Sequence, residues 1–101
     1  MKNDNTEVKA YLEITMQIPQ ENRGAAAKVY RDYRGPFLET IKGALTKNLL
    51  VREEDVSVIH GFDSAENAKA YLSSAMFQND VYTGLKPLWT ADPEVKIYTV
   101  K

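Results

Sequence analysis

The chain has 101 residues, of which 44% are hydrophobic and 27% are charged, with a formal net charge of −1 at pH 7. A chain of this length supports one hydrophobic core, and its balanced charge argues against nucleic-acid binding, which favours a basic surface. The chain has no cysteine and one histidine, His60, which excludes disulfides, thiolate sites and a metal site built from several histidines of one chain. We therefore expect one domain over residues 7–101, a flexible N-terminus over residues 1–6, and no metal.

The first residues are polar and lack the apolar core of a signal sequence. No apolar run approaches the roughly 20 residues that a membrane helix needs. These features predict a cytoplasmic protein with no membrane partner.

Alternating apolar residues mark the first element, a strand from Val8 to Ile18. Successive side chains of a strand point to opposite faces, so this pattern gives one apolar and one mixed face. Pro19 ends the strand because proline has no backbone N–H to donate to a neighbour.

Helical spacing of apolar residues follows from about Asn22 to Lys42. Pro36 interrupts this pattern because it lacks a backbone donor and clashes with the preceding turn. The sequence leaves open one helix kinked at Gly35-Pro36 or two short helices in succession. Gly43 is well placed to end the helical segment.

Two strands, at residues 44–52 and 56–62, then flank an acidic turn and are expected to form a hairpin. A second helix begins after Asp63 or Ser64, either of which can cap it.

The rest of the chain is predicted to contain a helix break and a last strand. The break is expected at Asn79-Asp80, where Asp80 can cap a short continuation of the second helix. The segment from Val95 to Val100 is rich in β-forming residues and reads as the final strand.

The element order predicts an α+β fold, the ferredoxin-like βαββαβ sandwich, in which two helices cover one face of a four-stranded antiparallel sheet. The other face then carries Tyr11 and Thr15 from the first strand and Tyr98 and Val100 from the last. Soluble monomers generally avoid exposing a large apolar patch, so we expect a homodimer formed through this sheet face. The competing interpretation is a monomer whose outer face meets water.

The segment from Gly61 to Phe77 resembles the dimeric α/β-barrel superfamily and, within it, the antibiotic-biosynthesis-monooxygenase group. The matching residues are Phe62, Ser64, Glu66, Ala70, Ser74 and Phe77. The resemblance implies that two protomers pair sheet to sheet. It also implies a cofactor-independent monooxygenase that acts on a small aromatic, quinol-like or polyketide-like compound. Haem-degrading members carry a histidine about one turn after the motif phenylalanine, where this chain has Val81, so we expect no cofactor.

His60 is the candidate catalytic base. It lies in an otherwise apolar strand, and a neutral imidazole can deprotonate a phenol or enol because its ordinary pKa lies near the operating pH. The competing interpretation is a structural histidine, hydrogen-bonded at the sheet edge or dimer interface. The candidate substrate pocket consists of aromatic and polar side chains, namely Tyr11, Asn48, Phe62, Tyr71, Phe77 and Trp89.

Two functions remain open. In the first, His60 deprotonates a small aromatic substrate that Tyr71 or Tyr11 orients, and the substrate anion reacts directly with oxygen. In the second, the chain is a non-catalytic dimer that binds a small ligand or serves an accessory role. The second function is favoured by the absence of histidines and a tryptophan found in related proteins, and a shared fold does not transfer activity. Whether the chain is an enzyme is therefore left undecided.

Overall fold

A computed structural model describes residues 7–101, so the expected flexible segment 1–6 lies outside the described residues. Within this range, no helix is long and apolar enough to cross a membrane. The elements, in chain order, are β1 (Ala10–Met16), η1 (Gln20–Asn22), α1 (Arg23–Thr40), β2 (Ala44–Val51), β3 (Val56–Phe62), α2 (Ala65–Tyr71), α3 (Ala75–Phe77), η2 (Gln78–Leu85), η3 (Lys86–Leu88) and β4 (Glu94–Thr99).

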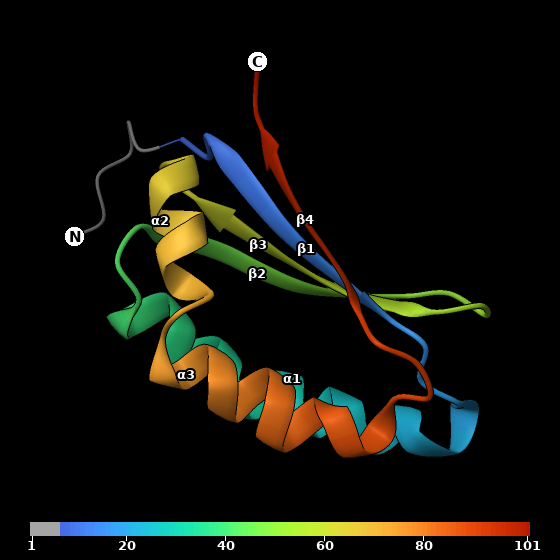
Figure 1. The fold of residues 1–101 in the computed structure, drawn as a ribbon. Helices are drawn as coiled ribbons and strands as arrows, with labels where there is room; N and C mark the ends of the chain where they lie inside the picture. Colours follow the sequence, from blue (N-terminus) through green and yellow to red (C-terminus); the bar gives the residue numbers. More distant parts are fainter. Residues whose placement is uncertain (1–6) are drawn as a thin grey trace.

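The four strands form one antiparallel sheet in the order β2-β3-β1-β4. All the helices lie on one face of this sheet, with α1 behind the run from α2 to η3 (Figure 1). The predicted ferredoxin-like architecture is therefore confirmed, including the hairpin of β2 and β3. The central strands β1 and β3 contribute most of the sheet's buried residues.

The pairing of β1 with β3 fixes which side chains enter the core. Leu12 lies opposite His60 and Ile14 lies opposite Val58, and all four are buried beneath the helices. Because side chains alternate along a strand, the intervening residues point to the outer face of the sheet. Thr15 and Ser57 are such a pair, and their hydroxyls are 2.7 Å apart.

The segment around Pro36 is one helix, which resolves the alternative that the sequence left open. Helix α1 runs without interruption from Arg23 to Thr40 with Pro36 inside it. The hydroxyl of Thr40 donates to the Pro36 carbonyl at 2.7 Å, and the Phe37 ring is completely buried. Burial of Phe37 anchors the final turn of α1 to the core and offsets the cost of the missing proline donor.

The second helical region breaks earlier than predicted. Helix α2 ends at Tyr71, and a new helix begins at Ala75, where the Ser74 hydroxyl accepts the Phe77 N–H at 3.1 Å. The predicted break at Asn79-Asp80 is wrong, because both residues lie within the π-helical η2. Ser74 supplies the cap, and Asp80 is buried beside a cation instead of capping a helix.

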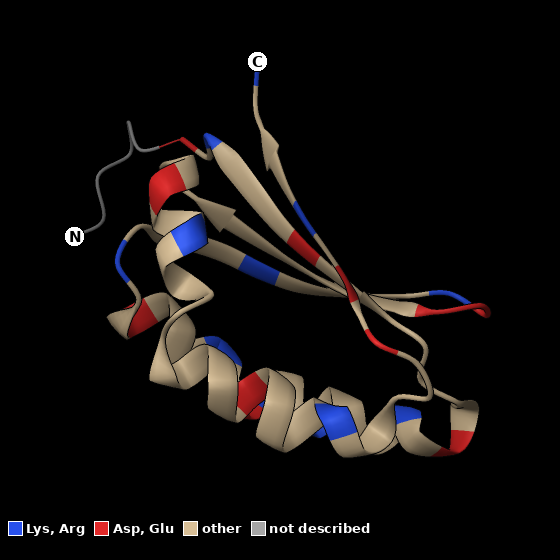
Figure 2. Cartoon of the chain, in the orientation of Figure 1, with Lys and Arg blue, Asp and Glu red and all other residues tan. Residues whose placement is uncertain are grey.

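Charged residues of both signs are interspersed along the helices, and residues of both signs also lie at the tip of the β2–β3 hairpin (Figure 2). At that tip Arg52 donates to both carboxylate oxygens of Asp55, at 2.7 and 2.8 Å. Arg23 also donates to the carbonyls of Arg52 and Glu53. These contacts tie the hairpin tip to the start of α1.

Candidate functional site

Four polar side chains are buried together between the sheet and the helices. Lys47 and His60 are each 1% exposed, Tyr71 is 2% exposed and Asp80 is 3% exposed. Lys47 and His60 are Cα partners on the neighbouring strands β2 and β3, whereas Tyr71 ends α2 and Asp80 lies in η2. Strand pairing and helix packing therefore gather groups from four separate elements.

Aromatic rings surround these polar groups. The ring of Tyr71 lies with its centroid 5.4 Å from His60, 5.0 Å from Phe37, 5.9 Å from Phe62 and 5.5 Å from Phe77. Such centroid separations are those of favourable aromatic pairs. We call the set the interior cluster, and its members are Phe37, Lys47, His60, Phe62, Tyr71, Phe77 and Asp80.

The imidazole of His60 is held in one orientation. Its Nδ1 lies 3.1 Å from the carbonyl oxygen of Leu12. A carbonyl only accepts, so Nδ1 carries the hydrogen and Nε2 presents a lone pair. Nε2 is buried and has no hydrogen-bond partner among the described residues.

Burial lowers the pKa of His60 to about 3, and the nearby charge of Lys47 acts in the same direction. The hydrogen bond with Leu12 opposes these effects. At neutral pH His60 is therefore an uncharged hydrogen-bond acceptor.

Tyr71 provides the second unpaired polar atom. Its hydroxyl oxygen is buried and has no partner among residues 7–101. Burial raises the pKa of Tyr71, and the negative charge of Asp80 raises it further, so the hydroxyl keeps its proton and can donate. An unpaired buried polar group costs about 1–3 kcal/mol, and two such groups in one cluster point to a water or ligand that pairs with them.

Lys47 and Asp80 form a buried ion pair that the sequence analysis did not identify. Lys47 Nζ lies 2.8 Å from Asp80 Oδ2, and the two side chains are 1% and 4% exposed. Burial lowers the pKa of Lys47 and raises that of Asp80, while each partner opposes the effect on the other. The available signal was weak: Lys47 shares its strand face with Leu49, and Asp80 precedes the apolar Val81.

The structure brings some of the predicted site residues together and separates others. Phe62, Tyr71 and Phe77 join His60 in the interior cluster. Tyr11 and Asn48 pair with Gly61 and Ile59, which places them on the outer face of the sheet. Tyr11 and Asn48 therefore do not share a pocket with His60, because side chains alternate along a strand and the sheet lies between them and His60.

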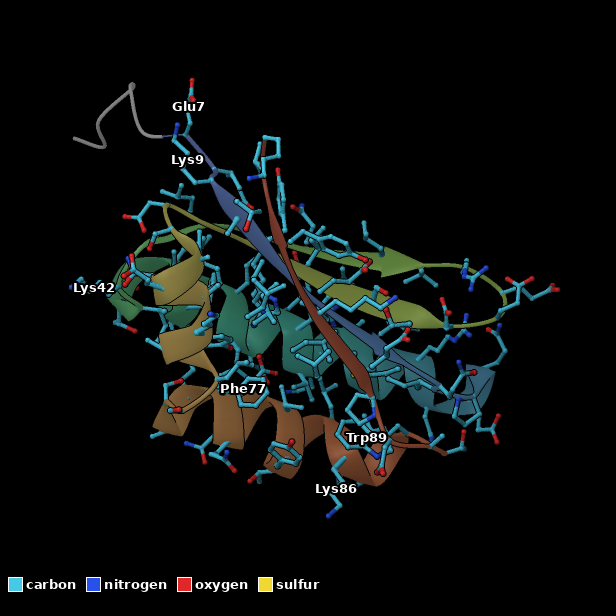
Figure 3. All side chains as sticks on the ribbon, turned by 45° about the horizontal axis from the view of Figure 1, so that its top comes forward. Glu7, Lys9, Lys42, Phe77, Lys86 and Trp89 are labelled. Atoms are coloured by element: carbon cyan, nitrogen blue, oxygen red, sulfur yellow. The ribbon has the colours of Figure 1, made fainter. Side chains whose placement is uncertain are left out.

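Trp89 lies at the far end of the helical run from Phe77 (Figure 3). Its ring centroid is 6.3 Å from that of Tyr82, which in turn is 5.7 Å from that of Phe77. Trp89 therefore extends a row of aromatic rings that begins in the interior cluster, although it does not itself touch His60.

A hollow of about 200 Å³ opens between the C-terminal end of α1 and helix α2. Its lining includes Ile41, Asn67 and Tyr71. Tyr71 therefore belongs to both, since it lines this hollow and also packs against His60 in the interior cluster. Two further hollows lie elsewhere, and His60 lines none of the three.

Among the described residues, no group of three or more His, Cys, Asp or Glu side chains is placed to hold a metal ion. The interior cluster offers one acceptor nitrogen, one phenolic hydroxyl and one ion pair. This chemistry suits a small molecule that carries hydroxyl or carbonyl groups on an aromatic ring.

Comparison with known family models finds no match, and no curated protein matches the chain. Solved structures do match. A conserved protein from Methanosarcina mazei superposes with a TM-score of 0.79 at 12% identity, covering 95% of this chain and 96% of that one. A protein from Caulobacter crescentus, named provisionally as an antibiotic biosynthesis monooxygenase, gives a TM-score of 0.79 at 13% identity and covers 95% and 92%.

A protein from Nitrosomonas europaea with the same provisional name gives a TM-score of 0.75 at 11% identity and covers 93% of this chain and 92% of that one. At such low identity these likenesses establish the fold. The resemblance drawn from Gly61 to Phe77 is confirmed at that level, because the matched structures carry the name of the group it indicated.

Proposed function

We propose that the chain is a cofactor-independent monooxygenase-like enzyme whose substrate is a small planar aromatic compound with an ionisable, quinol-like hydroxyl. The observation that carries the proposal is the pair of unpaired buried atoms, His60 Nε2 and the Tyr71 hydroxyl, inside one aromatic cluster. The fold supports it, since similar structures are named as monooxygenases.

The two unpaired atoms call for a ligand with a hydrogen-bond donor at one end and an acceptor at the other. His60 Nε2 accepts a hydrogen bond from a ligand hydroxyl, and the Tyr71 hydroxyl donates to a second ligand oxygen. The rings of Phe37, Phe62 and Phe77 supply apolar faces for the ligand's ring. The Tyr71 side chain lines the hollow beside α2 and packs against His60, so a ligand that enters from this hollow would reach His60 by displacing Tyr71.

The reaction balances without an external reductant. A phenol with a hydrogen on the opposite ring carbon reacts with one molecule of oxygen to give the quinone and one molecule of water. One oxygen atom enters the ring, and the other leaves in water with the hydroxyl hydrogen and the displaced ring hydrogen. The substrate supplies all four electrons, and the protein supplies orientation and a dry environment.

A specific observation favours the alternative of a non-catalytic ligand-binding protein. An efficient general base has a pKa near the operating pH, whereas burial lowers the pKa of His60 to about 3. His60 is therefore a good hydrogen-bond acceptor and a weak base in the folded chain. Binding without turnover would be the expected behaviour of this alternative.

The assembly that we propose is a homodimer in which the outer sheet faces of two protomers meet. This face carries Tyr11 and Tyr98, which are Cα partners, together with Ile59 and Leu50. Tyr98 is 48% exposed and Leu50 is 46% exposed, which leaves apolar surface for a partner to cover. Light scattering at micromolar concentration should give twice the chain mass, and a single chain mass would contradict the pairing.

Oxygen consumption and product analysis test the function. Wild-type protein is mixed with a panel of phenols, including 1-naphthol, whose ring carbon opposite the hydroxyl carries a hydrogen, under isotopically labelled oxygen. We expect substrate-dependent uptake and one labelled atom in the product, with loss of at least tenfold in His60→Asn and Tyr71→Phe variants. Tyr33→Phe serves as the matched control, since Tyr33 lies on α1 outside the interior cluster.

The outcomes separate the two functions. Saturable binding of the same compounds without oxygen uptake would favour the non-catalytic protein. Equal rates in wild type and the His60→Asn variant would remove His60 from the reaction.

A further inference from the structure

Lys47, the cation of the buried ion pair, lies beside His60. The two residues are Cα partners on β2 and β3, and both side chains lie against the ring of Phe37. Burial lowers the pKa of His60 and the positive charge of Lys47 lowers it further, whereas burial and then the negative charge of Asp80 raise the pKa of Tyr71. A ligand oxygen seated at His60 Nε2 would therefore lie near the Lys47 ammonium.

Lys47 also keeps hydrogen-bonding capacity. Its ammonium has three N–H donors, and one bond, to Asp80 at 2.8 Å, satisfies one of them. The ammonium lies 5.3 Å from the centroid of the Phe37 ring, which keeps it within the aromatic surroundings of the cluster. Arg34 and Tyr30 approach only the backbone carbonyl of Lys47, so they do not compete for its ammonium.

The position of Asp80 in the fold favours a role in the site. It lies in η2, a π-helical segment, and such segments are rare and frequent at functional sites. A buried ion pair gives little net stability when compared with well-packed apolar residues. A role in the site explains why the chain keeps a buried ion pair that adds little stability.

We infer that Lys47, held in place by Asp80, stabilises the ionised hydroxyl of the ligand, so that the site takes phenols and enols as their oxyanions. This inference rests on the proposed function, because it places the ligand's hydroxyl at His60 Nε2. The hydroxyl proton passes along its hydrogen bond to Nε2, and the oxygen then carries the negative charge that Lys47 faces. The new oxyanion in turn favours the protonated imidazole.

The charges of Lys47, Asp80, His60 and the ligand then sum to zero. Lys47 and protonated His60 contribute two positive charges, and Asp80 and the oxyanion contribute two negative charges. No proton has to enter or leave the protein for the ligand to ionise. The titratable or charged side chains around Lys47 of β2 are Asp80 from η2, His60 from β3 and Tyr71 from α2. Tyr30 and Arg34 from α1 reach only the backbone carbonyl of Lys47.

The probe for this inference is para-nitrophenol, whose phenolate form absorbs visible light and whose neutral form does not. Bound to wild-type protein at a pH below its free pKa, the probe should show the phenolate band, with an apparent pKa lowered by about one to three units. The band should disappear in the Lys47→Met/Asp80→Leu double variant, which removes both charges and keeps similar shapes. Lys47→Arg, which retains the positive charge, should keep the band.

The control is the Lys28→Met/Asp32→Leu double variant. Lys28 Nζ and Asp32 Oδ2 also form an ion pair, at 2.7 Å, but both side chains lie exposed on α1. This control should leave the phenolate band unchanged, which separates the buried pair from a general change in protein charge.

The failures of the two proposals are distinguishable. A neutral-form spectrum of the bound probe in wild type, or a phenolate band that persists in the Lys47→Met/Asp80→Leu variant, overturns the inference and leaves ligand binding intact. Absence of binding by para-nitrophenol and by naphthols in every variant contradicts the proposed function, and the inference falls with it.

Discussion

Acid should destabilise this protein through His60 in particular. The pKa of His60 falls from an ordinary value of 6.5 to about 3 in the folded chain, chiefly because of burial. As the pH falls below 6.5, His60 binds a proton in the unfolded chain but not in the folded chain, so the free energy of unfolding decreases. The decrease continues until the pH reaches the folded pKa.

The magnitude follows from the pKa difference. A shift from 6.5 to about 3 corresponds to about 5 kcal/mol at about 1.4 kcal/mol per pH unit. At pH 5 about 2 kcal/mol of this should already be lost, by the same relation. That loss is a large part of the stability of a small domain.

The assay is urea unfolding at pH 7 and pH 5, followed by the fluorescence of Trp89, the only tryptophan in the chain. The reference variant is His60→Asn, because an asparagine amide can still donate to the Leu12 carbonyl. Protein concentration is held fixed, since dimer formation would couple to unfolding. The raised pKa of Asp80 works in the opposite direction, but it does so in both proteins and cancels in the comparison.

We expect the wild type to lose about 2 kcal/mol more than the His60→Asn variant between the two pH values. Equal losses in the two proteins would refute the assignment of His60 as a buried neutral imidazole.

Three further predictions test the fold and the assembly. Gly43→Ala should lower the free energy of unfolding by at least about 1 kcal/mol in chemical unfolding, because Gly43 has a φ of 79°. Gly35→Ala should raise it by up to about 1 kcal/mol, because an added Cβ on this exposed part of the helix meets no atom within 4 Å. Ser74→Ala should cost about 1 kcal/mol through loss of the α3 cap, and Ser73→Ala should be close to neutral; equal effects would exclude the cap. Tyr98→Asp should convert the proposed dimer to a monomer in light scattering, and an unchanged mass would place the interface elsewhere.

The sequence predicted the sheet well because its strands carry strong local signals. The alternation around Leu12 and the short apolar run of β3 each identify a strand and its buried face. The helix break was predicted at the wrong place because Ser74 and Asp80 are both residue types that can cap a helix. Only the tertiary structure shows that Asp80 is committed to Lys47, which leaves Ser74 as the cap.

The candidate site was predicted in part for a related reason. The sequence indicated Phe62, Tyr71 and Phe77 as site residues together with His60, and in the structure Tyr71 packs against the other three. Lys47 was missed because β2 alternates weakly and a lysine in a strand usually points to solvent. Its burial depends on a partner 33 residues away in the chain, which no local pattern reveals.

The central claim is that His60 Nε2 presents a lone pair to a hydroxylated aromatic ligand. The most direct measurement is nitrogen NMR of the imidazole in protein labelled at histidine, which gives one residue's signals because the chain has a single histidine. At neutral pH without ligand, the spectrum should show a neutral ring protonated at Nδ1, and a saturating naphthol should shift the Nε2 resonance far more than the Nδ1 resonance. A ring protonated at Nε2 in the free protein, or an Nε2 resonance that does not move on adding the naphthol, would contradict the account.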